Sequence, residues 1–438
     1  MESQKESKEV DLIIHGAQLV SSQGRKSTDI AVKDGTIVKI APNLEEQGYA
    51  AGKVIDATHK VLLPGIIDSQ VHFRDPGLTH KEDLGTGSHA AALGGVTTFL
   101  EMPNTKPATT TIEALEEKLQ LAREKSWVDY GFFIGANGDN VEELQKATQL
   151  PGCCGIKIFL GSSTGDLLLY HPDKLQKIFK NIPSFPIAVH SEDEERLKER
   201  ISIRDNATSV LAHPEWRDVE VCLNSTQKII KLARDCGRGV HVLHVTTEEE
   251  MALLKNNKDL FTVEATPQHL TFSSPQCYEE LGTRVQMNPP IREERHRKSL
   301  WRAIEEEVVD VIGSDHAPHT LDEKAKPYPY SPSGMPGVQT LLPVMLNHVA
   351  QGELSLEKLV ELVCESPAQL YGLSDRGKLQ EGLKADMVLL DLDCQTTLED
   401  QDMASKCGWT PFHGQTTQGR IERVFLAGQE IVKDGQLQ

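Results

Sequence analysis

Several short apolar segments of this chain end in side chains that can bind a metal ion or an anionic substrate. Imidazole nitrogens combined with carboxylate oxygens form a ligand set that suits Zn²⁺. Residues two apart on a strand share one face, so residues 70 and 72 point the same way. The polar residues at these segment ends are Gln70, His72, Arg74, Asn104, Lys157, His190, His244, Asp315 and His319.

Each of these residues has an ordinary structural explanation when it is taken alone. A histidine at a strand end is often a hydrogen-bonded structural residue, Lys157 could extend its ammonium group to solvent, and Asp315 could cap a turn. Together, these explanations require six strand ends to direct costly polar groups to one rim by chance. We therefore predict one shared site, in which Asp315 binds metal and also transfers a proton.

Lys157 differs from the other candidates, because an ammonium group repels a metal cation. It fits a metal site in two forms, as an uncharged amine or as the carbamate that an amine forms with CO2. The carbamate would act as a bridging carboxylate. Carboxylation of Lys157 is therefore part of the metal-site hypothesis.

The elements that must position these side chains alternate between strand and helix. Residues 63–379 contain eight apolar segments separated by polar, helix-like stretches, which predict a (β/α)8 barrel with its chemistry at the carboxyl ends of the strands. A doubly wound open sheet is the alternative. No GxGxxG sequence opens a helix, which argues against dinucleotide binding. The predicted strands are residues 65–72, 96–102, 130–136, 155–161, 185–191, 241–247, 260–266 and 308–316.

Both ends of the chain predict β structure. Residues 28–40 alternate apolar and polar side chains around Asp34-Gly35, and residues 421–435 do so around Ala427-Gly428, which is typical of hairpins. Two separate β extensions would leave more exposed strand edges than one joint sheet. We therefore expect a small β-sandwich domain of residues 1–62 plus 380–438, beside a barrel domain of residues 63–379.

The amino-acid composition argues against nucleic-acid and membrane partners. The chain has 438 residues, of which 38% are hydrophobic, and a formal net charge of −19. The strong acidity argues against general nucleic-acid binding, and no apolar run is long enough to span a membrane. The polar N-terminus does not resemble a secretory signal, and the eight cysteines form no CxxC motif. We expect a cytoplasmic protein with free thiols and no nucleic-acid or membrane partner.

Six sequence blocks extend over nearly the whole chain: PGIIDSQVHFRDPG (64–77), EMPNT (101–105), NPPIR (288–292), SDHAPHT (314–320), PSGMPGVQT (332–340) and GWTPFHG (408–414). These blocks resemble the dihydroorotase family, in the cyclic amidohydrolase branch of the amidohydrolase superfamily. HFRDPG, MPNT and DHAPH are each moderately specific, and their combination is highly specific.

The resemblance implies a metal-dependent (β/α)8 barrel beside a small β-sandwich built from both termini. It also implies the reversible conversion of L-dihydroorotate to N-carbamoyl-L-aspartate in pyrimidine synthesis. Asp315 would be the general acid and base. The implied ligands of one or two Zn²⁺ ions are His72, His190, His244, Asp315 and a carboxylated Lys157. Arg74, Asn104 and His319 would hold the substrate carboxylate, and Asn288, Ser333 and Gly334 would contact the ring.

One position departs from the family pattern. The opening motif of the family is usually His-x-His, whereas this chain has Gln70 before His72. An amide oxygen is a weaker ligand than imidazole, so Gln70 either ligates weakly, leaves one metal under-coordinated, or accompanies a single metal. A second hypothesis is a non-catalytic scaffold that assembles with aspartate transcarbamoylase. Relatives of that kind lose several ligands, whereas this chain loses one.

Other activities on the same fold remain alternatives. Dihydropyrimidinase or hydantoinase and allantoinase share the metal centre, but their substrates lack the ring carboxylate of dihydroorotate, so Arg74 argues against them. A structural dihydropyrimidinase-like protein is a further alternative, against which the intact ligand set argues. A homodimer is expected from the resemblance only. The loop-like residues 321–337 are predicted to close over the site.

Overall fold

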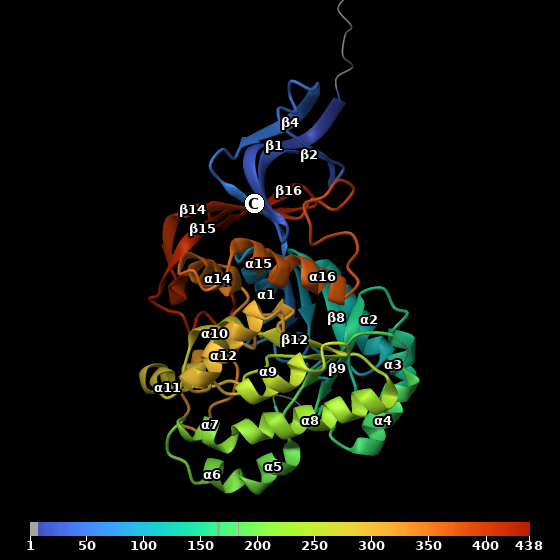
Figure 1. Cartoon of the computed structure of the whole chain (residues 1–438), viewed down its shortest axis with the longest axis vertical. Helices are drawn as coiled ribbons and strands as arrows, with labels where there is room; N and C mark the ends of the chain where they lie inside the picture. The colour runs from blue at the N-terminus through green and yellow to red at the C-terminus, as the bar shows by residue number, and fades with distance from the viewer. Residues whose placement is uncertain (1–7, 164–166, 183) are drawn as a thin grey trace, which may run out of the picture.

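The computed structural model describes residues 8–163, 167–182 and 184–438. Within them, eight parallel strands lie side by side in chain order and form a nearly closed barrel (Figure 1). This arrangement confirms the predicted (β/α)8 fold and excludes the doubly wound open sheet. The strands are β6 (Ile66–Val71), β7 (Val96–Glu101), β8 (Asp129–Gly135), β9 (Cys153–Phe159), β10 (Ile187–His190), β11 (Val240–Val242), β12 (Phe261–Ala265) and β13 (Val311–Ile312).

The barrel closes between its first and last strands at the end that carries the candidate site. β13 ends at Ile312, but the chain beyond it returns to β6, where Val71 and His316 form a parallel bridge. The backbone amide of His72 donates a hydrogen bond to the carbonyl oxygen of His316 at 2.7 Å. Closure of the barrel backbone therefore brings His72 close to Asp315.

Two strands, β11 and β13, are less than half as long as their apolar patterns predict. β13 has two residues where 308–316 is expected, and β11 has three where 241–247 is expected. His244 and Asp315 have φ angles of 37° and 45°, in the left-handed region that ends an extended strand. These two residues, which lie just beyond the strand ends, are also predicted to bind metal.

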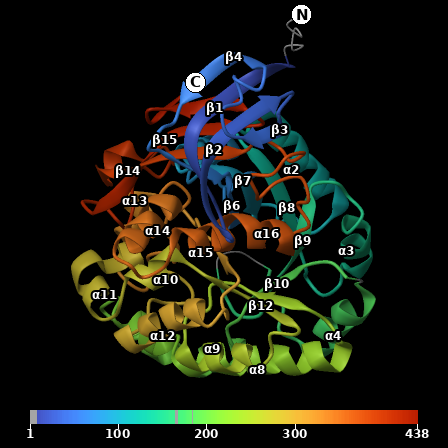
Figure 2. The same ribbon diagram turned by 45° about the horizontal axis from the view of Figure 1, so that its top comes forward.

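Helices cover the outside of the barrel, as Figure 2 shows. The capping residues agree with the observed bounds: Asp218 caps the start of α8 by accepting from the Val221 amide, and Gly237 ends the helix at a φ of 62°. The longer helices are α1 (Leu84–Leu93), α2 (Ile112–Lys125), α4 (Pro172–Asn181), α8 (Val219–Cys236), α9 (Glu248–Lys255), α12 (Glu294–Glu305) and α14 (Leu341–Ala350). Shorter ones are α3 (Val141–Ala147), α5 (Glu194–Glu199), α6 (Ile201–Asp205), α7 (Ala212–Trp216), α10 (Pro267–Thr271), α11 (Gln276–Leu281), α13 (Leu321–Lys324), α15 (Leu356–Val360) and α16 (Ser366–Leu370).

Both ends of the chain join one separate mixed sheet, so the alternative of two β extensions is wrong. Met387 of β14 pairs antiparallel with Pro64 of β5, which connects the C-terminal strands to the N-terminal ones. Both predicted hairpins form, and Asp34 and Ala427 each have a φ of 48° at the turn. The strands are β1 (Lys8–Ser21), β2 (Gly24–Lys33), β3 (Thr36–Ala41), β4 (Tyr49–Asp56), β5 (Val61–Pro64), β14 (Met387–Thr397), β15 (Thr416–Leu426), β16 (Gln429–Lys433) and β17 (Gln436–Leu437).

This sheet stands above one end of the barrel in Figure 1. The exact division into domains at residues 62/63 and 379/380 stays a prediction. The main apolar core lies between the barrel strands and the helices around them, and it includes Ile156 and Val189. The cysteines are free thiols, as the sequence predicts.

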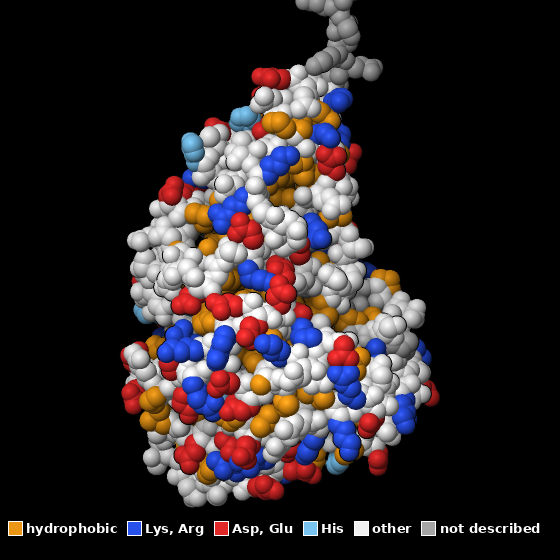
Figure 3. All heavy atoms as spheres, viewed as in Figure 1, with side chains coloured by type: hydrophobic (Ala, Val, Ile, Leu, Met, Phe, Trp, Pro, Cys, Tyr) orange, Lys and Arg blue, Asp and Glu red, His pale blue; other side chains and the backbone are white. Residues whose placement is uncertain are grey.

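One face of the molecule can be followed in the space-filling view (Figure 3), and it is mixed in charge. On the face drawn in Figure 3, acidic and basic side chains alternate, and the apolar areas between them are small. Among the described helices, each is too short or too polar to cross a bilayer.

Candidate functional site

A pocket at the carboxyl ends of the barrel strands gathers nearly all the residues predicted to do chemistry. Among the described residues of its wall, Phe159, Ser163 and Ala317 are the additional members. His319 is the one predicted residue that lies outside the lining. The predicted residues in the lining are Gln70, His72, Arg74, Asn104, Lys157, His190, His244, Asn288, Asp315, Ser333 and Gly334. The structure thus brings them together, and their individual roles stay predictions.

Asp315 and His72 form one pair of candidate ligands. Asp315 Oδ1 accepts a hydrogen bond from Gln70 Nε2 at 2.9 Å and lies 3.2 Å from His72 Nε2. His72 Nδ1 lies 2.6 Å from Asn104 Oδ1, so the proton of a neutral ring belongs on Nδ1. Burial lowers the pKa of His72 and favours that neutral ring. Its Nε2 lone pair then faces a carboxylate oxygen, an arrangement that a cation would stabilise.

His190 and His244 form the second pair. His190 Nδ1 lies 3.1 Å from His244 Nε2. Burial lowers the pKa of both imidazoles, which keeps them in the neutral form that metal ligation requires. Within the described residues, His244 Nδ1 is buried and has no hydrogen-bond partner.

Glu192 orients His190 from behind, a role that its sequence position, suited to the start of a helix, does not by itself reveal. Its Oε2 accepts a hydrogen bond from His190 Nε2 at 2.7 Å and pairs with Arg217. Burial would raise the pKa of Glu192, but Arg217 and His190 beside it hold that pKa at about 2. An ionised Glu192 places the proton of His190 on Nε2 and leaves Nδ1 free to ligate. The one sequence feature that could have indicated this role is the position of Glu192, two residues after the strand-end His190.

The surroundings of Lys157 favour the uncharged amine that a metal site requires. It is 1% exposed, its Nζ lies 4.6 Å from the centre of the Phe159 ring, and it has no hydrogen-bond partner in the described part of the chain. Burial lowers the pKa of Lys157 to about 7. A large neutral fraction is therefore present at physiological pH, and a neutral amine is the form that reacts with CO2.

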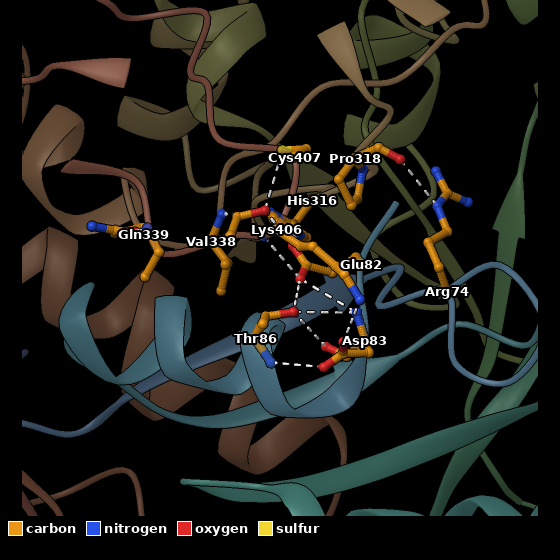
Figure 4. Close-up of polar contacts among 12 residues, drawn as sticks. Arg74, Glu82, Asp83, Thr86, His316, Pro318, Val338, Gln339, Lys406 and Cys407 are labelled. Carbon is orange, nitrogen blue, oxygen red and sulfur yellow. Dashed lines mark hydrogen bonds and ion pairs between the residues drawn. The ribbon is translucent and has the colours of Figure 1, made fainter. Parts of the chain in front are cut away.

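Arg74 supplies a buried cation on the same pocket. Its Nε donates to the Pro318 carbonyl oxygen at 3.3 Å (Figure 4), and its Nη2 lies 3.5 Å from His319 Nε2. Its Nη1 is buried and has no hydrogen-bond partner among the described residues. Although burial lowers the pKa of Arg74 to about 10, the guanidinium keeps its charge at neutral pH. It is therefore held on one side and open to an anion on the other.

His319 lies behind Arg74 rather than in the pocket lining. The Nε2 atom of His319 is 3.0 Å from the Ser333 carbonyl oxygen. The backbone carbonyl oxygen of His319 accepts a hydrogen bond from Trp409 Nε1 at 2.8 Å. Burial lowers the pKa of His319 to about 3, so the ring is neutral. The proton of His319 is therefore on Nε2 and goes to the Ser333 carbonyl oxygen, so His319 positions the Ser333 backbone and packs beside Arg74 without accepting a hydrogen bond from it.

The loop predicted to act as a lid is held firmly where it meets the pocket. Lys324 Nζ donates to the carbonyl oxygens of Gln286, Pro332 and Gly334 at 3.1, 2.8 and 2.9 Å. These bonds fix the backbone on either side of Ser333. Closure of this loop over a substrate stays a prediction.

A second buried carboxylate, Glu82, supports the loop that carries Asp315. Figure 4 shows it between α1, the loop around His316 and the C-terminal segment. One oxygen accepts from His316 Nε2 at 3.3 Å and from the Ser405 hydroxyl, while the other accepts from the Lys406 backbone amide at 3.2 Å. His316 Nδ1 accepts from the Gly337 amide at 3.0 Å. His316 is thus a structural histidine.

The side chains fit a metal ion by donor type. A carboxylate, neutral imidazoles and a lysine that can become a carbamate face one pocket, with the buried unpartnered atoms described above for His244 and Lys157. Across residues 8–163, 167–182 and 184–438, no three His, Cys, Asp or Glu side chains are grouped as a metal site. The candidate ligands lie in two pairs instead, and a carbamate on Lys157 would add the missing carboxylate.

The chain is similar to known proteins over nearly its whole length. A profile of the Amidohydrolase family matches residues 61–431. A dihydroorotase of Methanosarcina mazei is 34% identical over 428 residues, covering 95% of this chain and 91% of that protein. An allantoinase of Deinococcus radiodurans is 32% identical over 443 residues, covering 98% and 96%.

The fold has equally clear relatives among solved structures. The L-hydantoinase (dihydropyrimidinase) from Arthrobacter aurescens superposes with a TM-score of 0.94 at 30% identity, covering 98% of this chain and 97% of that one. Both the sequence relatives and this structural relative span almost the full length. The chain belongs to the amidohydrolase family.

Proposed function

We propose that this protein is a dihydroorotase, which hydrolyses the cyclic amide of L-dihydroorotate to N-carbamoyl-L-aspartate and catalyses the reverse reaction. The single observation that carries the proposal is the free Nη1 of Arg74 on a pocket that also holds the histidine and aspartate pairs. A buried cation with an open donor selects a substrate that carries an anion beside the scissile amide. L-dihydroorotate has a ring carboxylate, whereas hydantoin and allantoin lack one.

The substrate would be held at both of its ends. Arg74 donates to the carboxylate, with Asn104 beside it and His319 next to the guanidinium. On the other side, Asn288 and the backbone around Ser333 and Gly334 contact the ring. This placement presents the ring amide to Asp315.

Asp315 carries the proton in the proposed reaction. Its carboxylate accepts a proton from the attacking water as the oxygen adds to the ring carbonyl carbon. It then donates that proton to the departing ring nitrogen, so the C–N bond breaks without releasing an amide anion. In the reverse direction the same carboxylate removes the proton from the nitrogen that attacks.

The family is metal-dependent, and the residues that would hold metal here are His72, Asp315, His190, His244 and a carboxylated Lys157. One or two Zn²⁺ ions would polarise the ring carbonyl and activate water. Gln70 donates to Asp315 in this structure, and its Oε1 is the atom left for a weak metal contact. We further infer a homodimer, which rests on the family resemblance, and a cytoplasmic location, which the free cysteines support.

One divided sample of purified protein tests the proposal. Half is analysed for metal per chain, and half is assayed for ring opening of L-dihydroorotate by the loss of ultraviolet absorbance. We expect bound metal and turnover. Metal without turnover would favour the hydantoinase activity suggested by the structural relative, or allantoinase activity. Neither metal nor turnover, after zinc and bicarbonate are supplied, would favour a scaffold for aspartate transcarbamoylase.

A further inference from the structure

His213 stands directly behind Asn288, one of the residues that line the pocket. It belongs to the short helix α7 between β10 and α8, and it is 1% exposed. Its Nε2 lies 2.9 Å from the carbonyl oxygen of Met287 and 3.1 Å from Asn288 Oδ1. His213 itself does not line the pocket, so it can act on a substrate only through Asn288.

The two contacts of Nε2 define the tautomer of His213. A backbone carbonyl oxygen can only accept a hydrogen bond, so Nε2 must carry a proton. Because Nε2 is a donor, the Asn288 atom that faces it must be the amide oxygen rather than the amide nitrogen. The orientation of the Asn288 amide therefore follows from chemistry, independently of how its two similar atoms are assigned.

The surroundings keep His213 in this state. Burial, together with the charge of Arg217 nearby, lowers the pKa of His213 to about 3. Its Nδ1 is buried and has no hydrogen-bond partner in the described part of the chain. The rings of Trp216 and Tyr328 pack edge-on against the imidazole at 6.1 and 5.7 Å between ring centres. Because the two aromatic rings fix the orientation of the neutral imidazole, its protonated Nε2 stays directed at the Met287 carbonyl oxygen and at Asn288.

We propose that His213 is a positioning residue that fixes the Asn288 amide with its oxygen turned away from the substrate, so that Asn288 presents only N–H donors to the pocket. The substrate group at this position must then be a hydrogen-bond acceptor, namely a ring carbonyl oxygen. A ring N–H placed there would meet another donor and be rejected. This proposal deepens the proposed function and rests on it for the class of substrate, a cyclic amide.

A double-mutant cycle tests the coupling between the two residues. His213→Phe removes the donor, so we expect KM to rise about 5- to 150-fold, the range for one buried polar group left without its partner, while kcat changes less. His213→Gln keeps an amide donor and should recover most of the affinity. In an Asn288→Ala background, His213→Phe should change KM by less than about twofold. An equal rise in both backgrounds would overturn the proposal, because it would show a general packing role.

Asn288→Asp provides the matched control at the pocket itself. It keeps an oxygen for His213 but replaces the N–H donors by a second acceptor. We expect KM to rise at least as far as in Asn288→Ala. Binding as tight as in the wild type would show that no donor is needed at this position, and the proposal would fail. This variant also serves as the kinetic test if His213→Phe does not fold.

The kinetic tests use whichever of L-dihydroorotate, hydantoin and allantoin the wild-type enzyme opens. Failure on L-dihydroorotate alone therefore removes the dihydroorotase proposal and leaves the test of His213 intact. A second readout needs no substrate. The ¹⁵N signals of His213, assigned by their loss in His213→Gln, should show a neutral ring protonated at Nε2 from pH 6 to 8. An Nδ1–H tautomer or an imidazolium ion would overturn the proposal.

Discussion

Glu82 and His316 lie 3.3 Å apart between Oε2 and Nε2, although 234 residues separate them in the sequence. His316 Nδ1 accepts from the amides of Gly337 and Val338, so the imidazole proton is on Nε2 and points at Glu82. His316, the residue next to Asp315, is therefore anchored to the segment just before α1. Through Glu82 and Ser405 it is also linked to the C-terminal segment.

This anchor predicts a large cost for a small change. Glu82→Gln places an amide where a carboxylate accepts several donors, so at least one donor loses its partner. We expect the free energy of unfolding to fall by about 1–3 kcal/mol, measured by urea titration. Lys406→Ala is the control, because it removes a partly exposed ion pair with Asp83 and should cost less than about 1 kcal/mol. Equal costs would contradict the role of Glu82.

Arg74 should discriminate between substrates that do and do not carry a carboxylate. Arg74→Met removes the open guanidinium, and we expect it to weaken binding of L-dihydroorotate by about 2–5 kcal/mol. KM measured under steady-state conditions checks this. Any residual ring opening of hydantoin should keep its wild-type KM, since that ring has no carboxylate. The same loss for both substrates would mean that Arg74 supports the pocket and does not read the anion.

Asp315 should be essential for the chemical step. Asp315→Asn keeps an oxygen for the hydrogen bond from Gln70 but cannot take up a proton. We expect kcat to fall by about 100- to 10,000-fold. Circular dichroism of the variant serves as the folding control. Turnover near that of the wild type would remove Asp315 as the proton carrier.

Lys157 should make the stability of the metal-free protein depend on pH. Its pKa is about 7 in the folded protein and about 10.4 in the unfolded chain, so the unfolded state binds more protons between these values. Wild-type stability relative to Lys157→Met should therefore rise with pH above 7, by up to about 1.4 kcal/mol per pH unit. Below pH 7 both states bind the proton, so the difference should level off at its lowest value.

Urea titrations of both proteins from pH 6 to 9, without metal and bicarbonate, provide the measurement for Lys157. A difference between them that stays constant with pH would show that the lysine is charged in the folded state.

Gln70 should limit how much metal the site retains. Its Nε2 donates to Asp315 and so competes with a cation for that carboxylate. Gln70→His supplies an imidazole instead, and we expect more zinc per chain after dialysis against a zinc buffer, measured by elemental analysis. Gln70→Ala, which supplies no ligand, should not show this gain. Equal zinc in the wild type and Gln70→His would show that position 70 is not a ligand position.

Much of the fold and site was predictable from local pattern. The alternation of apolar and polar segments identified all eight barrel strands, and the turn sequence at Asp34-Gly35 identified a hairpin. The pocket residues were predictable because the ends of parallel strands meet at one rim. The short length of β11 and β13 was not, since an apolar pattern continues through His244 and Asp315 although their backbones turn away.

The supporting residues were beyond the reach of sequence pattern. Glu82, His213 and Arg217 are buried polar residues whose partners lie far away in the chain, and each resembles a surface residue when it is read in its own segment. The motif around His319 suggests direct contact with the substrate, but the ring of His319 lies next to Arg74 and outside the pocket lining. Only the packing of separate loops reveals which polar group serves another.

The turn of α7 carries His213 and Arg217, whose backbones are linked by a hydrogen bond of 3.0 Å. His213 reaches Asn288 on the substrate side, and Arg217 reaches Glu192 and through it His190 on the metal side. The turn thus connects the proposed substrate side of the pocket to its proposed metal side. We therefore expect one substitution in this turn to disturb both sides of the pocket at once, although α7 itself lines neither.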